Sequence, residues 1–140
     1  MGLDLSLTGT GCIVISNEEV LHTELIKSKP SGKSTTKELE RLIKIKNRVR
    51  DIVLEQRPAL AVIEGLAFMA KSTALAQLSG LNYFVREILY ENSVNFIIVA
   101  PSTLKKFVTG AGNCPKDLIL LEVYKRYHKS FTDDNLADAF

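Results

Sequence analysis

The chain has 140 residues, 46% of them hydrophobic and 24% charged, which is the size and composition of one compact domain with a buried core. A formal net charge of +2 neither requires nor excludes a nucleic-acid partner, and two isolated cysteines and two isolated histidines argue against a zinc site. No apolar run approaches the ~18 residues of a membrane span, and the N-terminus has no secretory pattern, so we expect a cytoplasmic protein that binds no membrane.

The first quarter of the chain predicts three strands. Residues 1–7 are apolar and extended, and the composition of residues 8–11, Thr-Gly-Thr-Gly, predicts a turn. Residues 12–15 and 20–26 predict two more strands around a polar turn, and the three should form an antiparallel meander. A polar loop over residues 27–35 should lead into a helix that ends near Gln56, because Pro58 disfavours helix in the residue before it.

The rest of the chain alternates between strands and helices. Residues 60–63 predict a buried strand that ends at Glu64, followed by a helix over 72–91 and a strand over 96–99. Helices over 102–108 and 116–127 should flank a glycine-containing loop, and a last helix should begin near Asp134 and continue past residue 140. This order predicts an α/β fold with a mixed five-stranded sheet, three strands antiparallel and two parallel. Right-handed crossovers place the fourth strand beside the first, so Asp4 and Glu64 can be neighbours.

Two acidic residues stand at strands. Asp4 lies between apolar neighbours, where a carboxylate is costly unless it is paired or binds a metal; a solvent-facing side chain on an edge strand explains it equally well. Glu64 follows a buried strand directly, and ligands of open α/β sheets gather beyond the carboxyl ends of strands. The alternative is that Glu64 only begins a loop.

A third acidic group opens the last predicted helix. Asp134, Asn135 and Asp138 are spaced to share one helix face, and capping by Asp133 or Asp134 would not explain Asp138. Oxygen ligands without Cys or His suit Mg²⁺ or Mn²⁺. Two such ions about 4 Å apart would activate a water and stabilise the leaving oxygen of a phosphodiester.

Four segments in chain order resemble the RuvC-type Holliday-junction resolvases. Residues 2–11 are similar to their opening motif, and residues 62–64 with 68–71 to their second motif. Residues 100–113 resemble their basic loop, and residues 134–139 their closing acidic motif in its bacteriophage form. The resemblance implies a single RNase H-like domain over residues 1–140. It also implies a Mg²⁺-dependent endodeoxyribonuclease of the bacterial or phage-infected cytoplasm that cuts four-way junctions and other branched DNA.

The resemblance also implies which residues bind metal. Asp4, Glu64 and Asp138 match the family's metal ligands, which hold two Mg²⁺ ions per site, with Mn²⁺ as a substitute. The family's fourth ligand position holds Asn135 here, which can give a carbonyl oxygen but cannot act as a base. Either Asn135 is a weak ligand or Asp134 substitutes for it.

The region after the second predicted parallel strand carries candidate DNA contacts. Lys105, Lys106 and Lys116 should neutralise phosphates near the scissile bond, and the backbone amides around Gly110 and Gly112 could form an anion-binding concavity. A solvated loop is the alternative.

Two further features have structural alternatives. By resemblance, Phe68 is an aromatic that stacks at the junction centre, although a core phenylalanine fits as well. Basic residues recur along one face of the predicted helix before Gln56, at Lys37, Arg41, Lys44 and Arg48, and we interpret them as a solvated face.

The helix predicted over residues 72–91 is apolar on more than one side, so it needs two packing partners. One is the sheet, and the other could be the same helix in a two-fold symmetric homodimer, whose symmetry would match a four-way junction. The alternative is a helix buried wholly within the monomer.

Two other functions compete with cleavage. The same fold could bind branched DNA without cutting it, because Asn135 weakens the metal site. ATP-dependent kinases and ATPases of the actin-like class also open with an Asp in a first strand and a Gly-Thr-Gly turn. A chain of 140 residues lacks their second lobe and second phosphate loop.

Overall fold

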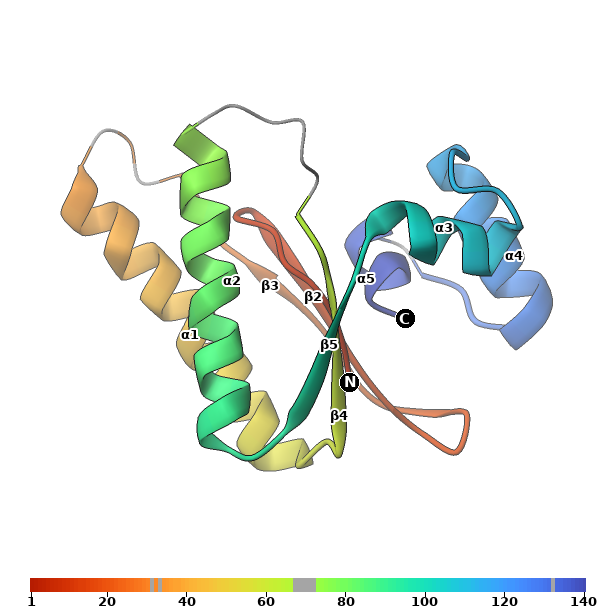
Figure 1. Ribbon diagram of the computed structural model, residues 1–140, viewed down its shortest axis with the longest axis horizontal. Coiled ribbons are helices and arrows are strands. Elements are labelled where there is room, and N and C mark those ends of the chain that lie inside the picture. Colours follow the sequence, from red (N-terminus) through yellow and green to blue (C-terminus); the bar gives the residue numbers. More distant parts are fainter. Residues whose placement is uncertain (31, 33, 67–72, 132) are drawn as a thin grey trace.

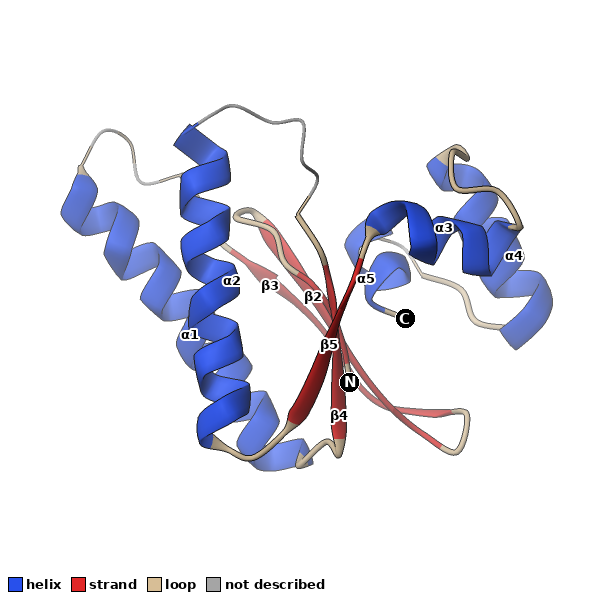
Figure 2. Cartoon of the chain, viewed as in Figure 1, coloured by secondary structure: helices blue, strands red, loops and turns tan. Residues whose placement is uncertain are grey.

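The computed structural model describes the chain except residues 31, 33, 67–72 and 132. Its elements, drawn in Figures 1 and 2, are β1 (Gly2–Asp4), β2 (Gly9–Ser16), β3 (Glu19–Lys27), α1 (Thr35–Gln56), β4 (Leu60–Glu64), α2 (Thr73–Glu91), β5 (Asn95–Val99), α3 (Pro101–Thr109), α4 (Lys116–Tyr127) and α5 (Asp134–Ala139). Within these described ranges, every helix is either too short or too polar to cross a bilayer.

The five strands form one mixed sheet in the order β3-β2-β1-β4-β5. β1 pairs antiparallel with β2, and β2 pairs antiparallel with β3, whereas β1–β4 and β4–β5 are parallel pairs. This arrangement confirms the predicted sheet and the predicted place of β4 beside β1. Because Leu3 is in register with Ile63, the next residues, Asp4 and Glu64, end two neighbouring parallel strands.

The main core lies between the sheet and the helix pair α1–α2, which covers one face of the sheet (Figure 1). α1 turns toward this core a stripe of apolar residues three to four positions apart, and α2 does the same. The stripe consists of Leu42, Ile45, Val49, Ile52 and Val53 on α1, and of Leu81, Val85, Ile88 and Leu89 on α2. Each such side chain contributes about 1.5–3 kcal/mol when fully buried, so this layer fixes the sheet on which the acids stand.

α3, α4 and α5 lie on the other side of the sheet (Figure 1). α5 contacts β1 and β2 directly, while α3 and α4 pack on each other around a smaller cluster of Cys114, Ile119 and Val123. Asp133 caps α5, since its carboxylate accepts a hydrogen bond from the Asn135 N–H at 3.0 Å. The helices predicted over 102–108 and 116–127 are thereby confirmed as α3 and α4.

The predicted turn over residues 8–11 is wrong, because Gly9 to Gly11 already belong to β2. Gly11 pairs with Asp4 on one side and with Leu25 on the other. A Cβ atom on Gly11 would lie only 2.0 Å from the backbone carbonyl oxygen of Asn135 in α5. The glycine therefore allows a helix to approach the strand closely, and its presence does not indicate a chain reversal.

Candidate metal centre

Three carboxylates from distant parts of the chain meet at one point. Asp4 ends β1, Glu64 ends β4, and Asp138 lies in α5, which crosses β1 and β2. One oxygen from each of the three lies within 4.8 Å of the other two, and all three residues are half-buried. Oxygen donors at this separation fit a hard divalent cation.

The electrostatics of this cluster favour a bound cation. Burial, the charges of Asp4 and Asp138 and a hydrogen bond with Asp4 together raise the pKa of Glu64 to about 8, and the Lys105 ammonium opposes this rise. At neutral pH the cluster therefore retains a proton rather than three full negative charges. A divalent cation would replace that proton, because it neutralises the same carboxylates more strongly.

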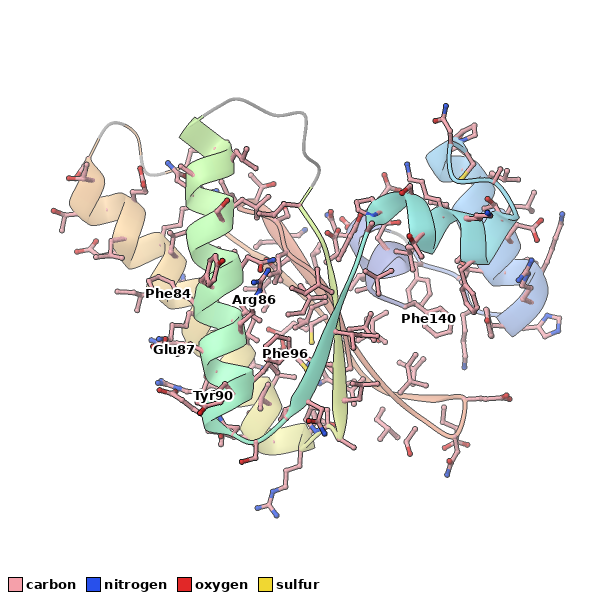
Figure 3. The ribbon with its side chains drawn as sticks, viewed as in Figure 1. Phe84, Arg86, Glu87, Tyr90, Phe96 and Phe140 are labelled. Carbon is pink, nitrogen blue, oxygen red and sulfur yellow. The ribbon has the colours of Figure 1, made fainter. Side chains whose placement is uncertain are left out.

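Glu64 and Asp138 face a small cavity of about 180 Å³. Most of its other lining residues are apolar, namely Met1, Leu3, Ile15, Val62, Val99, Leu104, Ala139 and Phe140. Figure 3 shows Phe140 beneath α3, next to the end of the chain. These apolar walls remove water from Glu64, and burial is the largest cause of its raised pKa.

Asn135 makes a different contact from the one expected of a ligand. Its side-chain amide donates to the Asp133 carboxylate at 2.9 Å, and its backbone N–H donates to the same oxygen. The amide nitrogen thus completes the N-terminal cap of α5. Asp134 is exposed and is not part of the three-carboxylate group. A ligand role for either residue stays a prediction.

The predicted DNA-contact residues differ in their exposure and in whether they act on the carboxylates. Lys105 is half-buried and close enough to affect the Glu64 pKa, whereas Lys106 is exposed. Gly110 ends α3 in the left-handed conformation, with φ of 81°, and a Cβ on Gly112 would lie 3.1 Å from the Ser102 carbonyl oxygen. Lys116 is the first residue of α4. Phe68 falls outside the described residues.

The loop that follows Asp4, residues 5–8 between β1 and β2, is held by contacts that the sequence did not reveal. Thr10 is fully buried; its hydroxyl donates to the Ser6 carbonyl at 2.8 Å and accepts from the Ser6 N–H at 3.2 Å. From outside the loop, the Arg41 guanidinium and the Ser28 hydroxyl both donate to the Leu7 carbonyl oxygen. The only sequence signal was the run of Ser and Thr beside glycines, which is typical of side-chain-to-backbone bonds.

Comparisons of the sequence agree with this geometry. The family model described as "Crossover junction endodeoxyribonuclease RuvC" matches residues 1–139. A protein of that description from Treponema denticola is 32% identical over 120 residues, which cover 83% of this chain and 65% of the relative. Another, from Rickettsia massiliae, is 28% identical over 124 residues, which cover 86% of this chain and 76% of the relative.

The fold has close counterparts among solved structures. The RuvC structure of Thermus thermophilus matches with a TM-score of 0.79 at 22% identity, over 99% of this chain and 86% of that one. The T. thermophilus protein in complex with a Holliday junction substrate matches with a TM-score of 0.80 at 23% identity and the same coverage. The sheet order and flanking helices are those of the RNase H-like fold of RuvC. With the family model matching nearly its whole length, the chain belongs to the RuvC family of crossover junction endodeoxyribonucleases.

Proposed function

We propose that this protein is a structure-selective endonuclease that hydrolyses phosphodiester bonds in Holliday junctions and other branched DNA. The observation that carries the proposal is the convergence of Asp4, Glu64 and Asp138 within 4.8 Å. The family membership supports the nuclease class, and a similar Thermus protein is described in complex with a Holliday junction substrate. The bacteriophage branch of the family stays a prediction.

The three carboxylates would hold the metal, and their donor chemistry fits Mg²⁺, with Mn²⁺ as a substitute. When bound, two such ions would supply an activated water and neutralise the leaving oxygen. Asn135 or Asp134 would fill the fourth ligand position. The apolar cavity wall keeps bulk water from the carboxylates, which strengthens their hold on a cation.

Basic groups on α3 and after it would hold the DNA. The Lys105 charge acts on Glu64, which supports a contact between its ammonium and the phosphate that would reach the carboxylates. Lys106, Lys116 and the backbone amides around Gly110 and Gly112 would contact neighbouring phosphates. Such contacts give affinity and position rather than sequence preference.

The test is a Glu64→Gln substitution, which keeps the shape of the side chain and removes its charge. We expect junction binding in Ca²⁺ to be retained and cleavage in Mg²⁺ to fall by more than about 100-fold, since a metal centre contributes several kcal/mol. The matched control is Glu19→Gln on the exposed start of β3, which should cut like the parent protein. Normal cleavage by Glu64→Gln would refute the proposed mechanism.

One observation favours a second function, the binding of branched DNA without cleavage. The fourth ligand position holds Asn135, whose amide carbonyl is uncharged, so this position is weaker than a carboxylate would make it. Incubation of a synthetic four-way junction with Mg²⁺ and, separately, with Mn²⁺ distinguishes the two functions. A stable complex without nicks in either metal would support the binding function and contradict the nuclease.

We also propose that α2 forms the interface of a homodimer. Tyr83 and Tyr90 on α2 are 67% and 82% exposed, so the helix is not wholly buried within the monomer. Beside it, a groove of about 490 Å³ lies between α2 and β5, and Figure 3 shows Arg86 on the side of α2 that faces β5. The double substitution Tyr83→Glu and Tyr90→Glu should convert a dimer to a monomer in sedimentation velocity. A parent protein that sediments as a monomer would contradict the proposal.

A further inference from the structure

A basic groove lies beside the loop that follows Asp4. The groove has a volume of about 740 Å³ and runs between that loop, the end of β3 and the first half of α1. Its cations are Lys27, Lys29, Lys37, Arg41 and Lys44, and its one acidic residue is Glu40. These residues carry a net charge of +4 in a chain whose total is +2, so the rest of the chain carries −2. Positive charge is therefore concentrated in this groove.

The lysines of the groove differ from the basic residues farther along α1. Arg48 donates two hydrogen bonds of 2.7 Å to Glu24, and Lys46 lies 2.6 Å from Glu87, so both charges are neutralised within the protein. Lys27, Lys29, Lys37 and Lys44 are exposed and form no ion pair with any described residue. The predicted solvated face over residues 37–48 thus divides into a paired half and an unpaired, cationic half.

Arg41 fixes the groove to the loop that follows Asp4. Arg41 Nε donates to the Ser28 hydroxyl at 2.8 Å, and its terminal nitrogen donates to the Leu7 carbonyl oxygen. The Ser28 N–H donates to the Thr8 carbonyl oxygen at 3.1 Å, which ties the end of β3 to the same loop. Thr8, which lines the groove, is four residues from Asp4, a path of at most about 14 Å. A strand of duplex DNA carries one charge per about 3.4 Å of axis, so this path covers at most about four nucleotides.

We propose that this groove binds the phosphate backbone of a duplex arm within about four nucleotides of the scissile phosphate. The inference rests on the proposed nuclease function, because the carboxylates define where the scissile phosphate lies. DNA is the partner that fits, since the unpaired lysines adjoin a centre built for a phosphodiester. Lys37, Arg41 and Lys44 follow one face of α1 in steps of about one turn, so they offer a row of charges to a regular polyanion.

The test compares two triple variants that remove equal charge. The groove variant is Lys29→Gln, Lys37→Gln, Lys44→Gln, and the control is Arg50→Gln, Lys125→Gln, Arg126→Gln, all at exposed positions. Junction affinity is measured in Ca²⁺ between 50 and 200 mM KCl. The salt slope is the slope of log Kd against log [KCl], and loss of three phosphate contacts should lower it by about 2.7. The ratio of variant to parent Kd should therefore fall about 40-fold between 50 and 200 mM KCl. The control should keep the parent slope.

A second measurement locates the contact. Neutral methylphosphonates, placed one at a time within about four nucleotides of the cleavage site, should weaken binding by the parent at the groove contact and leave binding by the groove variant unchanged. If the parent binds the junction and the groove variant has the same salt slope as the parent, the groove proposal is refuted and the nuclease proposal stands. A groove that binds an acidic protein instead of DNA would give this result. If the parent binds no junction, both proposals are refuted. Equal thermal melting of the two variants shows that neither result comes from unfolding.

Discussion

A single methyl group at Gly11 should disable the metal centre without unfolding the protein. The Cβ of Gly11→Ala would lie 2.0 Å from the Asn135 carbonyl oxygen and 2.6 Å from the carbonyl carbon, both of which are backbone atoms of α5. Ordinary contact begins at 3.4 Å, so α5 must move about 1.4 Å away from β2. Asp138 lies one turn farther along this helix and must move with it.

The expected loss follows from that displacement. The three carboxylates now lie within 4.8 Å of one another, and moving one of them by more than 1 Å weakens the shared grip on a cation. A misplacement of about 1 Å costs about 100-fold in rate, which corresponds to about 2.7 kcal/mol in the activation barrier. Most of the fold should survive, because the core between the sheet and the α1–α2 pair does not include α5.

The assay is single-turnover cleavage of a four-way junction in Mg²⁺, with circular dichroism as the check on folding. Gly9→Ala is the matched control in the same strand, since its Cβ would meet only the Asn135 and Leu25 side chains, each at 3.4 Å. We expect Gly9→Ala to cut within a few-fold of the parent rate. Cleavage by Gly11→Ala at the rate of Gly9→Ala would show that the metal centre does not depend on close approach of α5.

Three other predictions follow from named contacts. The folded pKa of Glu64, about 8, lies above its ordinary value of 4.5, so the metal-free protein should lose stability as pH rises from 4.5 to 8, and Mg²⁺ should reverse that loss. Thermal melting across this pH range in EDTA and in Mg²⁺ tests the prediction, and parallel curves of melting temperature against pH would contradict it. Lys105→Ala should move the pH midpoint of Ca²⁺ binding upward, because the ammonium lowers the Glu64 pKa, whereas Lys106→Ala should leave the midpoint in place. Asn82 is 1% exposed and its amide has no hydrogen-bond partner among the described residues. Asn82→Leu should therefore raise the free energy of unfolding, measured in urea, by about 1–3 kcal/mol. A decrease would show that the amide forms hydrogen bonds in the folded protein.

The sheet and two of the three acids could be predicted because they depend on local patterns and one chirality rule. Alternating and continuous apolar runs marked the strands, and the right-handed crossover placed β4 beside β1. Parallel pairing then brings the carboxyl ends of both strands to the same edge, so Asp4 and Glu64 had to be neighbours. Helical spacing made Asp138 a candidate together with Asp134 and Asn135, but the choice of Asp138 as the ligand required the family resemblance, since no local pattern states which face of the sheet a six-residue helix will cross.

Other features of the site could not be predicted, because they depend on contacts between segments far apart in sequence. Thr-Gly-Thr-Gly has the composition of a turn, and only the approach of α5, more than 120 residues later, shows why Gly11 has no side chain. Arg41 was grouped with solvated cations because its helical spacing matched theirs, yet it is half-buried and bonded to the Leu7 carbonyl. Spacing reports which face of a helix a residue occupies and not what that face meets.

Asn135 has two roles, one predicted from the sequence motif and one seen in its hydrogen bonds. Its position in the closing motif predicts a metal ligand, while its contacts assign the amide nitrogen to the cap of α5 through Asp133. The two roles are compatible, because an amide that donates through nitrogen keeps its carbonyl oxygen as an acceptor. An aspartate at this position would face the Asp133 carboxylate and lose that donor, which would loosen the helix that carries Asp138. The amide thus carries no ligand charge but secures the start of the helix, so the strength of the proposed metal centre should depend on how firmly α5 is held as well as on how many carboxylates the centre contains.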